Sequence, residues 1–238
     1  MSLSIIRKSS ENLRSTCANP DSLPANSAWQ ARYEALFVLQ LEWTWTCACG
    51  TEQPLLAGTN VDGIGFNNIG ILPQNRRDSV AAAMARRFAP ENLGNFDCIT
   101  CPTRRPRTEA IRIEGSPEYL RIKLSIVQAN GRRNDNPVAL PRTLDLTEYQ
   151  AIGPAQATNS MPKPPLKYTL RSVVSHGGET TGSGHWAASV HGPKQVFYIN
   201  DAQVHQQNTS LLKANPQVHM GSGNMQAVLL MYRRVHTR

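Results

Sequence analysis

Two pairs of cysteines constrain the fold of this chain more than any other feature. Cys47 and Cys49 form a Cys-x-Cys pair, and Cys98 and Cys101 form a Cys-x-x-Cys pair. Four thiolates are the ligands of a closed, tetrahedral structural zinc site, and zinc binding by thiolates is coupled to folding. The sequence therefore predicts that two distant segments meet at a Zn²⁺ ion. The alternative is that these cysteines are small buried hydrophobic residues or form a vestigial site.

The remaining cysteine and the start of the chain bear on the cellular compartment. Cys17 makes the number of cysteines odd, at 5. An odd number argues against a disulfide framework, and the opening residues turn polar too soon for a secretory signal. We therefore expect a reducing compartment, the cytoplasm or the nucleus. No stretch reaches the roughly 18 apolar residues of a spanning helix, so no membrane partner is expected.

The basic charge is distributed unevenly. The chain has 25 Lys and Arg against 17 Asp and Glu, a formal net charge of +8, and the whole excess lies after residue 119. Such an asymmetry raises the question of an anionic partner. The basic residues are scattered pairs without interleaved aromatic residues, so a solvated basic surface is the simpler interpretation. A basic zinc protein that binds nucleic acid is the last of our alternatives.

Hydrophobic periodicity predicts an α+β fold with a mostly antiparallel sheet and few helices. Apolar and polar residues alternate at 39–46 and at 119–126, as in half-buried strands. Further strands are predicted at 167–175, 185–191, 195–199 and 225–233. Short strands that are separated by glycine-rich turns are typical of antiparallel pairing.

One helix is predicted between the two cysteine pairs. Val80, Met84 and Phe88 recur at every fourth position, which places them on one helical face. Asp78 or Ser79 is expected to cap its N-terminus. By contrast, the basic segment 102–107 is interpreted as a turn.

A histidine and an acid-amide pair indicate a possible site of catalysis. His185 directly follows a glycine-rich loop and begins a predicted strand, and the next strand ends at Asn200-Asp201. A short turn between the two strands would bring Asn200 beside His185. An amide beside an imidazole fixes its tautomer and orientation, which is the third-group role in nucleophilic catalysis. The alternative is a structural histidine and an ordinary turn, and His176 nearby is interpreted as a polar loop residue.

Five short motifs follow one another in the C-terminal half of the chain: Tyr168–Leu170, His176–Gly178, Gly184–Trp186, Phe197–Asp201 and Leu230–Tyr232. Their order resembles the C-terminal half of the ubiquitin-specific proteases. In that family the pattern is Tyr-x-Leu, His-x-Gly, Gly-His-Tyr, an aromatic strand that ends in Asn-Asp or Asp-Asp, and a Leu-x-Tyr strand. Upstream, Pro117–Leu124 and Pro141–Tyr149 are similar to the family's preceding elements, and the cysteine pairs match its zinc-bearing fingers subdomain.

The resemblance implies half of a papain-like cysteine peptidase: an antiparallel palm sheet with a fingers extension. It implies hydrolysis of the isopeptide bond at the ubiquitin C-terminus, with ubiquitin or a ubiquitinated protein as the partner. By residue, His185 would be the general base, Asn200 would orient it, and Asp201 would help to polarise the site near the oxyanion. Structural Zn²⁺ would be held by Cys47, Cys49, Cys98 and Cys101.

The resemblance is least complete at the nucleophile. The family's Gly-Asn-Thr-Cys-Tyr box is matched only by the Thr16-Cys17 step and Asn12-Leu13 before it, so Cys17 is a weak candidate. The segment between Cys17 and the fingers is too short for the family's thumb subdomain. We therefore expect a divergent or truncated enzyme that is inactive alone, unless a thumb-supplying or scaffold protein completes it. The main alternative is a catalytically inactive module that binds ubiquitin or another partner.

The predicted domain organisation follows from these assignments. Residues 1–29 are polar and contain helix breakers, so we expect a loose leader. Residues 30–235 would form the fingers and palm, with the fingers at about 36–110 and the palm at about 111–235.

Overall fold

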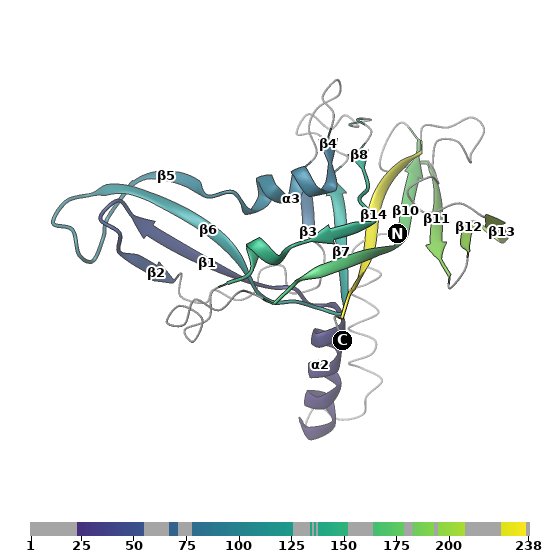
Figure 1. Ribbon diagram of the computed structural model, residues 1–238, viewed down its shortest axis with the longest axis horizontal. Helices are drawn as coiled ribbons and strands as arrows, with labels where there is room; N and C mark the ends of the chain where they lie inside the picture. Colours follow the sequence, from purple (N-terminus) through teal and green to yellow (C-terminus); the bar gives the residue numbers. More distant parts are fainter. Residues whose placement is uncertain are drawn as a thin grey trace.

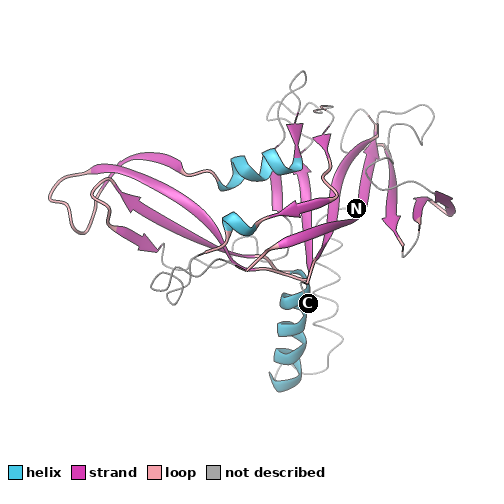
Figure 2. Ribbon diagram, viewed as in Figure 1, coloured by secondary structure: helices cyan, strands magenta, loops and turns pink. Residues whose placement is uncertain are grey.

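The structure is a computed structural model. It describes residues 23–54, 67–70, 78–125, 134, 136, 138–151, 164–178, 183–192, 195–207 and 225–236. In chain order the elements are α2 Leu23–Phe37, β1 Gln40–Cys47, β2 Glu52–Pro54, β3 Asn67–Gly70, β4 Asp78–Ser79, α3 Val80–Phe88, β5 Glu91–Phe96, β6 Arg105–Gly115, β7 Tyr119–Ser125, β8 Val138–Ala139, β9 Thr143–Asp145, the 3-10 turn η1 Thr147–Tyr149, β10 Lys167–Gly177, β11 His185–His191, β12 Val196–Asn200, β13 Gln203–Gln207 and β14 Gln226–Arg234. Strands dominate, and helices are few (Figure 2).

A sheet of four described strands extends from one side of the molecule in the order β2-β1-β6-β5 (Figure 1). β1 and β6 pair antiparallel over nearly their whole lengths. At the inner end of this pair Leu41 lies opposite Ile113, and both side chains are buried. The outer end lies away from this core (Figure 1). Cys47 is the last residue of β1 at that end, and Cys98 and Cys101 follow the end of β5. The alternation predicted at 39–46 is therefore confirmed as a strand.

The larger sheet has the order β13-β12-β11-β10-β14-β7-β3 among the described strands, and β9 pairs with β10. All of its pairs are antiparallel except β3 with β7. The core lies where β7, β10 and β14 meet. Tyr168 and Tyr232 are fully buried there, and their hydroxyls donate to the carbonyls of Pro117 and Pro141, each at 2.9 Å. These bonds satisfy the polar ends of two large apolar side chains.

Helix α3 forms as the sequence predicts. The Ser79 side chain accepts a hydrogen bond from the backbone N–H of Ala82 at 3.0 Å, so Ser79 is the N-cap. Val80, Met84 and Phe88 are all buried against the core that the two sheets share. Within the described part of the chain, no helix is both long and apolar enough to span a bilayer.

Asp78 is a buried carboxylate at the start of α3, and removing it is expected to destabilise the fold. Its side chain is 0% exposed, accepts from the Ser79 backbone N–H at 2.8 Å, and binds Arg86 at 2.7 and 3.1 Å. Asp78→Ala should lower the free energy of unfolding by about 2–3 kcal/mol in a urea titration. In the matched control Asp97→Ala, the carboxylate is 89% exposed beside Arg104, and the loss should be under about 1 kcal/mol. Equal losses would contradict this assignment.

Helix α2 corrects the prediction of a loose leader up to residue 29, because residues 23–29 are helical. Pro24 stands in the first turn, where proline is tolerated. Trp29, Tyr33 and Phe37 recur at every fourth position, and the neighbouring ring centroids are 5.4 Å apart in both pairs. Phe37 continues the stack to Tyr119 on β7 at 5.9 Å. Residues 1–22 lie outside the described residues, so the leader prediction there stays a prediction.

Candidate functional site

The first cysteine pair lies in a tight turn at the end of β1. Cys47 is the last residue of the strand, and its carbonyl accepts from the Gly50 N–H at 2.8 Å. Gly50 has a φ of 85°, a left-handed conformation that favours glycine. The backbone N–H of Cys47 donates to the Thr51 carbonyl at 2.9 Å, which closes the turn. Cys49 therefore projects from a well-defined loop.

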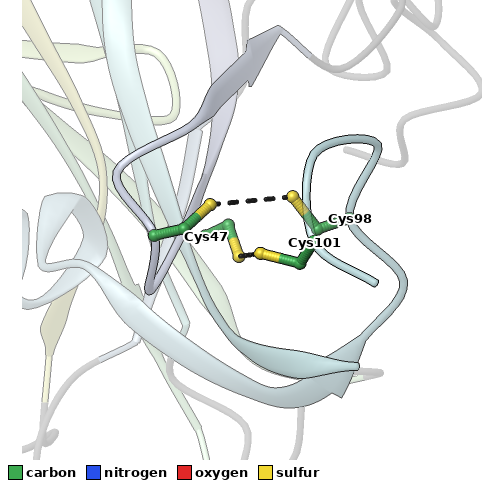
Figure 3. A group of neighbouring side chains, drawn as sticks. Cys47, Cys98 and Cys101 are labelled. Atoms are coloured by element: carbon green, nitrogen blue, oxygen red, sulfur yellow. Dashed lines mark hydrogen bonds between the residues drawn. The ribbon is translucent and has the colours of Figure 1, made fainter. Parts of the chain in front are cut away.

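The second cysteine pair lies between β5 and β6 and meets the first pair. β6 pairs with both β1 and β5, so the ends of these strands are held side by side. The sulfurs of Cys47 and Cys101 are 3.8 Å apart, and so are those of Cys49 and Cys98. All four Sγ atoms lie within 4.8 Å of one another. Figure 3 shows sulfurs from both loops turned toward a common centre.

The donor set fits a tetrahedral zinc ion. A Zn–S bond of about 2.3 Å gives an S···S edge of about 3.8 Å in a regular tetrahedron. Two of the sulfur pairs have this separation, 3.8 Å. The same separation is far longer than the roughly 2.05 Å of a disulfide. The prediction that the four cysteines converge on one place is therefore confirmed, and the residues are suited to a metal ion.

The protonation of the thiols also favours a cation. Hydrogen bonds from the side chain and backbone of Thr51 lower the pKa of Cys49 to about 6, so this sulfur ionises readily. The adjoining Cys49 sulfur is the main reason why the pKa of Cys101 is raised to about 12. A second thiolate beside the first is repelled unless a positive ion lies between them. Bound metal would remove this conflict.

A clamped arginine lies beside the cysteine cluster. Arg107 of β6 is the cross-strand partner of Cys47, so both side chains lie on the same face of the sheet. Its guanidinium carbon is 3.3 Å from the ring centroid of Trp45 and 4.0 Å from that of Phe96. Cation–π contacts with two rings hold the charge in place. A zinc ion with four thiolates carries two negative charges, which this arginine would partly offset.

The candidate catalytic residues lie together at one end of the β11–β12 hairpin. His185 begins β11 and Asn200 ends β12, and the antiparallel register pairs Ser189 with Tyr198 between them. The Oδ1 atom of Asn200 is hydrogen-bonded to Nε2 of His185. The Asp201 carboxylate is 4.0 Å from the same nitrogen, in a turn where Asp201 has a φ of 52°. The predicted juxtaposition of His185 and Asn200 is confirmed, and their roles remain predictions.

The glycine before His185 is required by close packing. Gly184 has a φ of 150°, and a Cβ there would lie 2.1 Å from the Gly177 carbonyl oxygen and 2.5 Å from Nε2 of His176. His176 is 2% exposed and lies on β10, so its interpretation as a polar loop residue is wrong. Its ring is 4.4 Å from that of its cross-strand partner Trp186. His176 thus supports the backbone that presents His185.

The imidazole of His185 is reachable from solvent, since its side chain is 39% exposed. With Nε2 held by Asn200, the other ring nitrogen is left to exchange a proton with a reacting group. The cysteines that the structure describes all belong to the metal-ligand cluster. Cys17, the nucleophile candidate, lies outside the described residues.

Most of the chain matches a known protein family. The sequence model of the family "Ubiquitin carboxyl-terminal hydrolase" matches residues 9–232. Ubiquitin carboxyl-terminal hydrolase 5 of Saccharomyces cerevisiae is 31% identical over 122 residues, which are 47% of this chain and 15% of that protein. Ubiquitin carboxyl-terminal hydrolase 4 of Vanderwaltozyma polyspora is 34% identical over 112 residues, 42% of this chain and 13% of that protein. The chain thus matches under a sixth of the length of these relatives.

Solved structures show the same fold. A chain of the SAGA Ubp8/Sgf11/Sus1/Sgf73 DUB module bound to ubiquitin aldehyde superposes with a TM-score of 0.60 at 22% identity, covering 83% of this chain and 41% of that chain. A form of the module that contains a substituted Ubp8 and a shortened Sgf11 gives a TM-score of 0.63 at 22% identity, with 86% and 42% covered. The family match includes both cysteine pairs and the His185–Asn200 hairpin. This chain is a member of the ubiquitin carboxyl-terminal hydrolase family.

Proposed function

We propose that this chain is a cysteine-type deubiquitinase domain that acts on the bond after the C-terminal glycine of ubiquitin. The observation that carries the proposal is the hydrogen bond between His185 and Asn200, at the exposed end of a hairpin that also presents Asp201. Membership of the family supports the same reaction. A solved structural neighbour is bound to ubiquitin aldehyde, which supports ubiquitin as the partner.

The chemistry would be acyl transfer through a thioester. His185 would take the proton of a cysteine thiol, and the sulfur would attack the carbonyl carbon of the terminal glycine. His185 would then give that proton to the departing lysine amine, and a water molecule would hydrolyse the thioester with His185 again acting as base. Asn200 would hold the ring in position throughout. The Asp201 carboxylate would help to polarise the site near the oxyanion, as the family resemblance implies. At 4.0 Å from Nε2 of His185, it would also support the positive charge on the imidazole.

Cys17 is the nucleophile that we propose within this chain. The family match begins at residue 9 and therefore includes Cys17. The alternative source of the catalytic thiol would be a thumb-supplying or scaffold protein. With either source of the thiol, the enzyme would work in the cytoplasm or the nucleus, where thiols stay reduced.

The four cysteines would hold a structural zinc ion in this proposal. A closed set of four thiolates leaves no position open for substrate, so the metal would supply folding energy and no catalytic step. It would fix the outer end of the sheet β2-β1-β6-β5. That sheet would then act as a rigid arm beside the larger sheet, available to contact ubiquitin.

A ubiquitin probe tests the proposal. Ubiquitin with a C-terminal electrophile should label the full chain under reducing conditions, and peptide mass spectrometry should place the adduct on Cys17. Cys17→Ser should abolish labelling, whereas Cys98→Ser should not remove the reactive thiol itself. Labelling of another cysteine would contradict Cys17 as the nucleophile.

A chain that the probe does not label would point to a second candidate function, ubiquitin binding without hydrolysis. If the chain binds unmodified ubiquitin in a titration but is not labelled, it is a ubiquitin-binding module that lacks hydrolase activity. Because the module needs only the two sheets, its affinity should survive both Cys17→Ser and His185→Gln. Absence of both labelling and binding would overturn both functions.

A further inference from the structure

Two threonine hydroxyls connect the loops that carry the cysteine pairs. Thr51 lies two residues after Cys49, and Thr100 lies between Cys98 and Cys101. The Thr51 hydroxyl donates to the Thr100 hydroxyl, with an oxygen–oxygen distance of 3.1 Å. The bond therefore joins segments that are 49 positions apart in the sequence. It lies beside the sulfurs and outside the set of metal donors.

Each threonine is also bound to the cysteines of its own loop. The Thr51 carbonyl accepts from the Cys47 N–H at 2.9 Å, and its hydroxyl oxygen is 3.1 Å from the sulfur of Cys49. In the other loop, the Thr100 N–H donates to the sulfur of Cys98 at 3.4 Å. A continuous chain of hydrogen bonds thus runs from Cys49 through both threonines to Cys98. These two sulfurs are 3.8 Å apart, a tetrahedral edge.

We propose that the Thr51–Thr100 hydroxyl bridge is a positioning device that presets the two cysteine loops for zinc. The inference rests on the proposed zinc site and adds residues that would not touch the metal. Groups that hydrogen-bond metal ligands typically change metal affinity by about 10–100-fold when they are removed. Pairing of β1 and β5 with β6 brings the two loops together, and the bridge adds a direct side-chain bond between the loops themselves.

The bridge suits both states of the site. With Cys49 protonated, its thiol donates to the Thr51 hydroxyl, which donates to Thr100. A metal-bound Cys49 is a thiolate, which only accepts. The hydroxyl hydrogens then rotate, so that Thr100 donates to Thr51 and Thr51 donates to the sulfur. The same heavy-atom arrangement then serves both states, and the thiolate accepts a hydrogen bond from Thr51.

Metal titration tests the bridge without any need for enzymatic activity. Thr51→Val keeps the size of the side chain and removes the hydroxyl. We expect its Co²⁺ affinity, followed by the thiolate charge-transfer absorption, and its Zn²⁺ affinity, from competition with a chromophoric chelator, to fall by about 10-fold. Thr51→Ser should restore affinity. Thr100→Val removes the bridge but keeps the contact between Thr51 and the Cys49 sulfur, so it should also lower the affinity. The double variant should lose little more than Thr51→Val, because the bridge is already broken in that variant.

Thr103→Val is the matched control. Thr103 is an exposed threonine just beyond the second cysteine pair, and its loss should change the affinity by less than about 2-fold. Circular dichroism in excess zinc should show that every variant folds. If Thr51→Val binds metal as tightly as Thr103→Val, the bridge has no positioning role. A wild-type chain that binds neither metal would overturn the zinc site and the bridge together, while ubiquitin labelling would still test the catalytic proposal.

Discussion

Cys101→Ser is expected to abolish tight zinc binding and to unfold the outer end of the sheet β2-β1-β6-β5. Structural zinc supplies on the order of 10 kcal/mol to the folding of small thiolate sites. The outer end of this sheet buries few apolar side chains, because most of β5 is exposed and the buried apolar pair Leu41 and Ile113 lies at the inner end. A serine hydroxyl is a poor zinc ligand, so three thiolates would remain and the site would lose its closure.

The zinc content of the protein and the protection of its backbone amides from hydrogen exchange measure this effect. The wild-type chain should retain one zinc per chain through dialysis, and Cys101→Ser should retain none. Hydrogen exchange in β1, β5 and β6 should then rise by orders of magnitude, while β10 and β14 in the larger sheet stay protected. A chelator should have the same effect on the wild type. Cys17→Ser is the control, because Cys17 is not one of the four clustered cysteines, and its zinc content should be unchanged. Intact protection in Cys101→Ser would exclude a structural metal.

The features that the sequence predicts correctly are those whose geometry is fixed by local rules. The convergence of the four cysteines is predictable because two closely spaced cysteine pairs are recognisable in the sequence as a possible set of metal ligands. Antiparallel pairing with β6 aligns the two loops that carry them. His185 and Asn200 meet because a short hairpin allows few registers. The helix over Val80–Phe88 follows from its apolar period and its Ser79 cap. In each case the residues that decide the structure lie close together in the sequence or, for the cysteines, form one set of donors that could hold a metal ion.

The features that local patterns miss depend on partners far away in the sequence. The basic composition of 102–107 predicts a turn, yet β6 begins at Arg105. Arg107 fits a strand because its charge lies against Trp45 and Phe96, which local polarity does not reveal. β13 consists of polar residues and Val204, and its strand conformation comes from pairing with β12. β5 likewise has a weak apolar pattern, and its strand conformation comes from antiparallel pairing with β6.

His185→Gln is expected to lower kcat/KM for a ubiquitin–lysine isopeptide or a ubiquitin C-terminal amide by on the order of 10³-fold. The reason is that glutamine keeps a polar side chain at the start of β11 but cannot take up the thiol proton. His205→Gln is the matched control, because His205 is an exposed histidine on β13 and its substitution should leave kcat/KM unchanged. Ubiquitin affinity should be similar for both variants. Full turnover by His185→Gln would exclude this imidazole as the base.

Asn200→Ala should have a smaller effect than the loss of the imidazole, and the difference tests how the pair works. The alanine variant keeps the base but releases its ring, so we expect kcat to fall by about 10–100-fold with KM nearly constant, as for lost positioning in the transition state. Asn200→Asp should recover most of the rate, because a carboxylate also accepts from Nε2 of His185. An alanine variant as active as the wild type would show that the His185–Asn200 bond has no catalytic role, whatever the nucleophile.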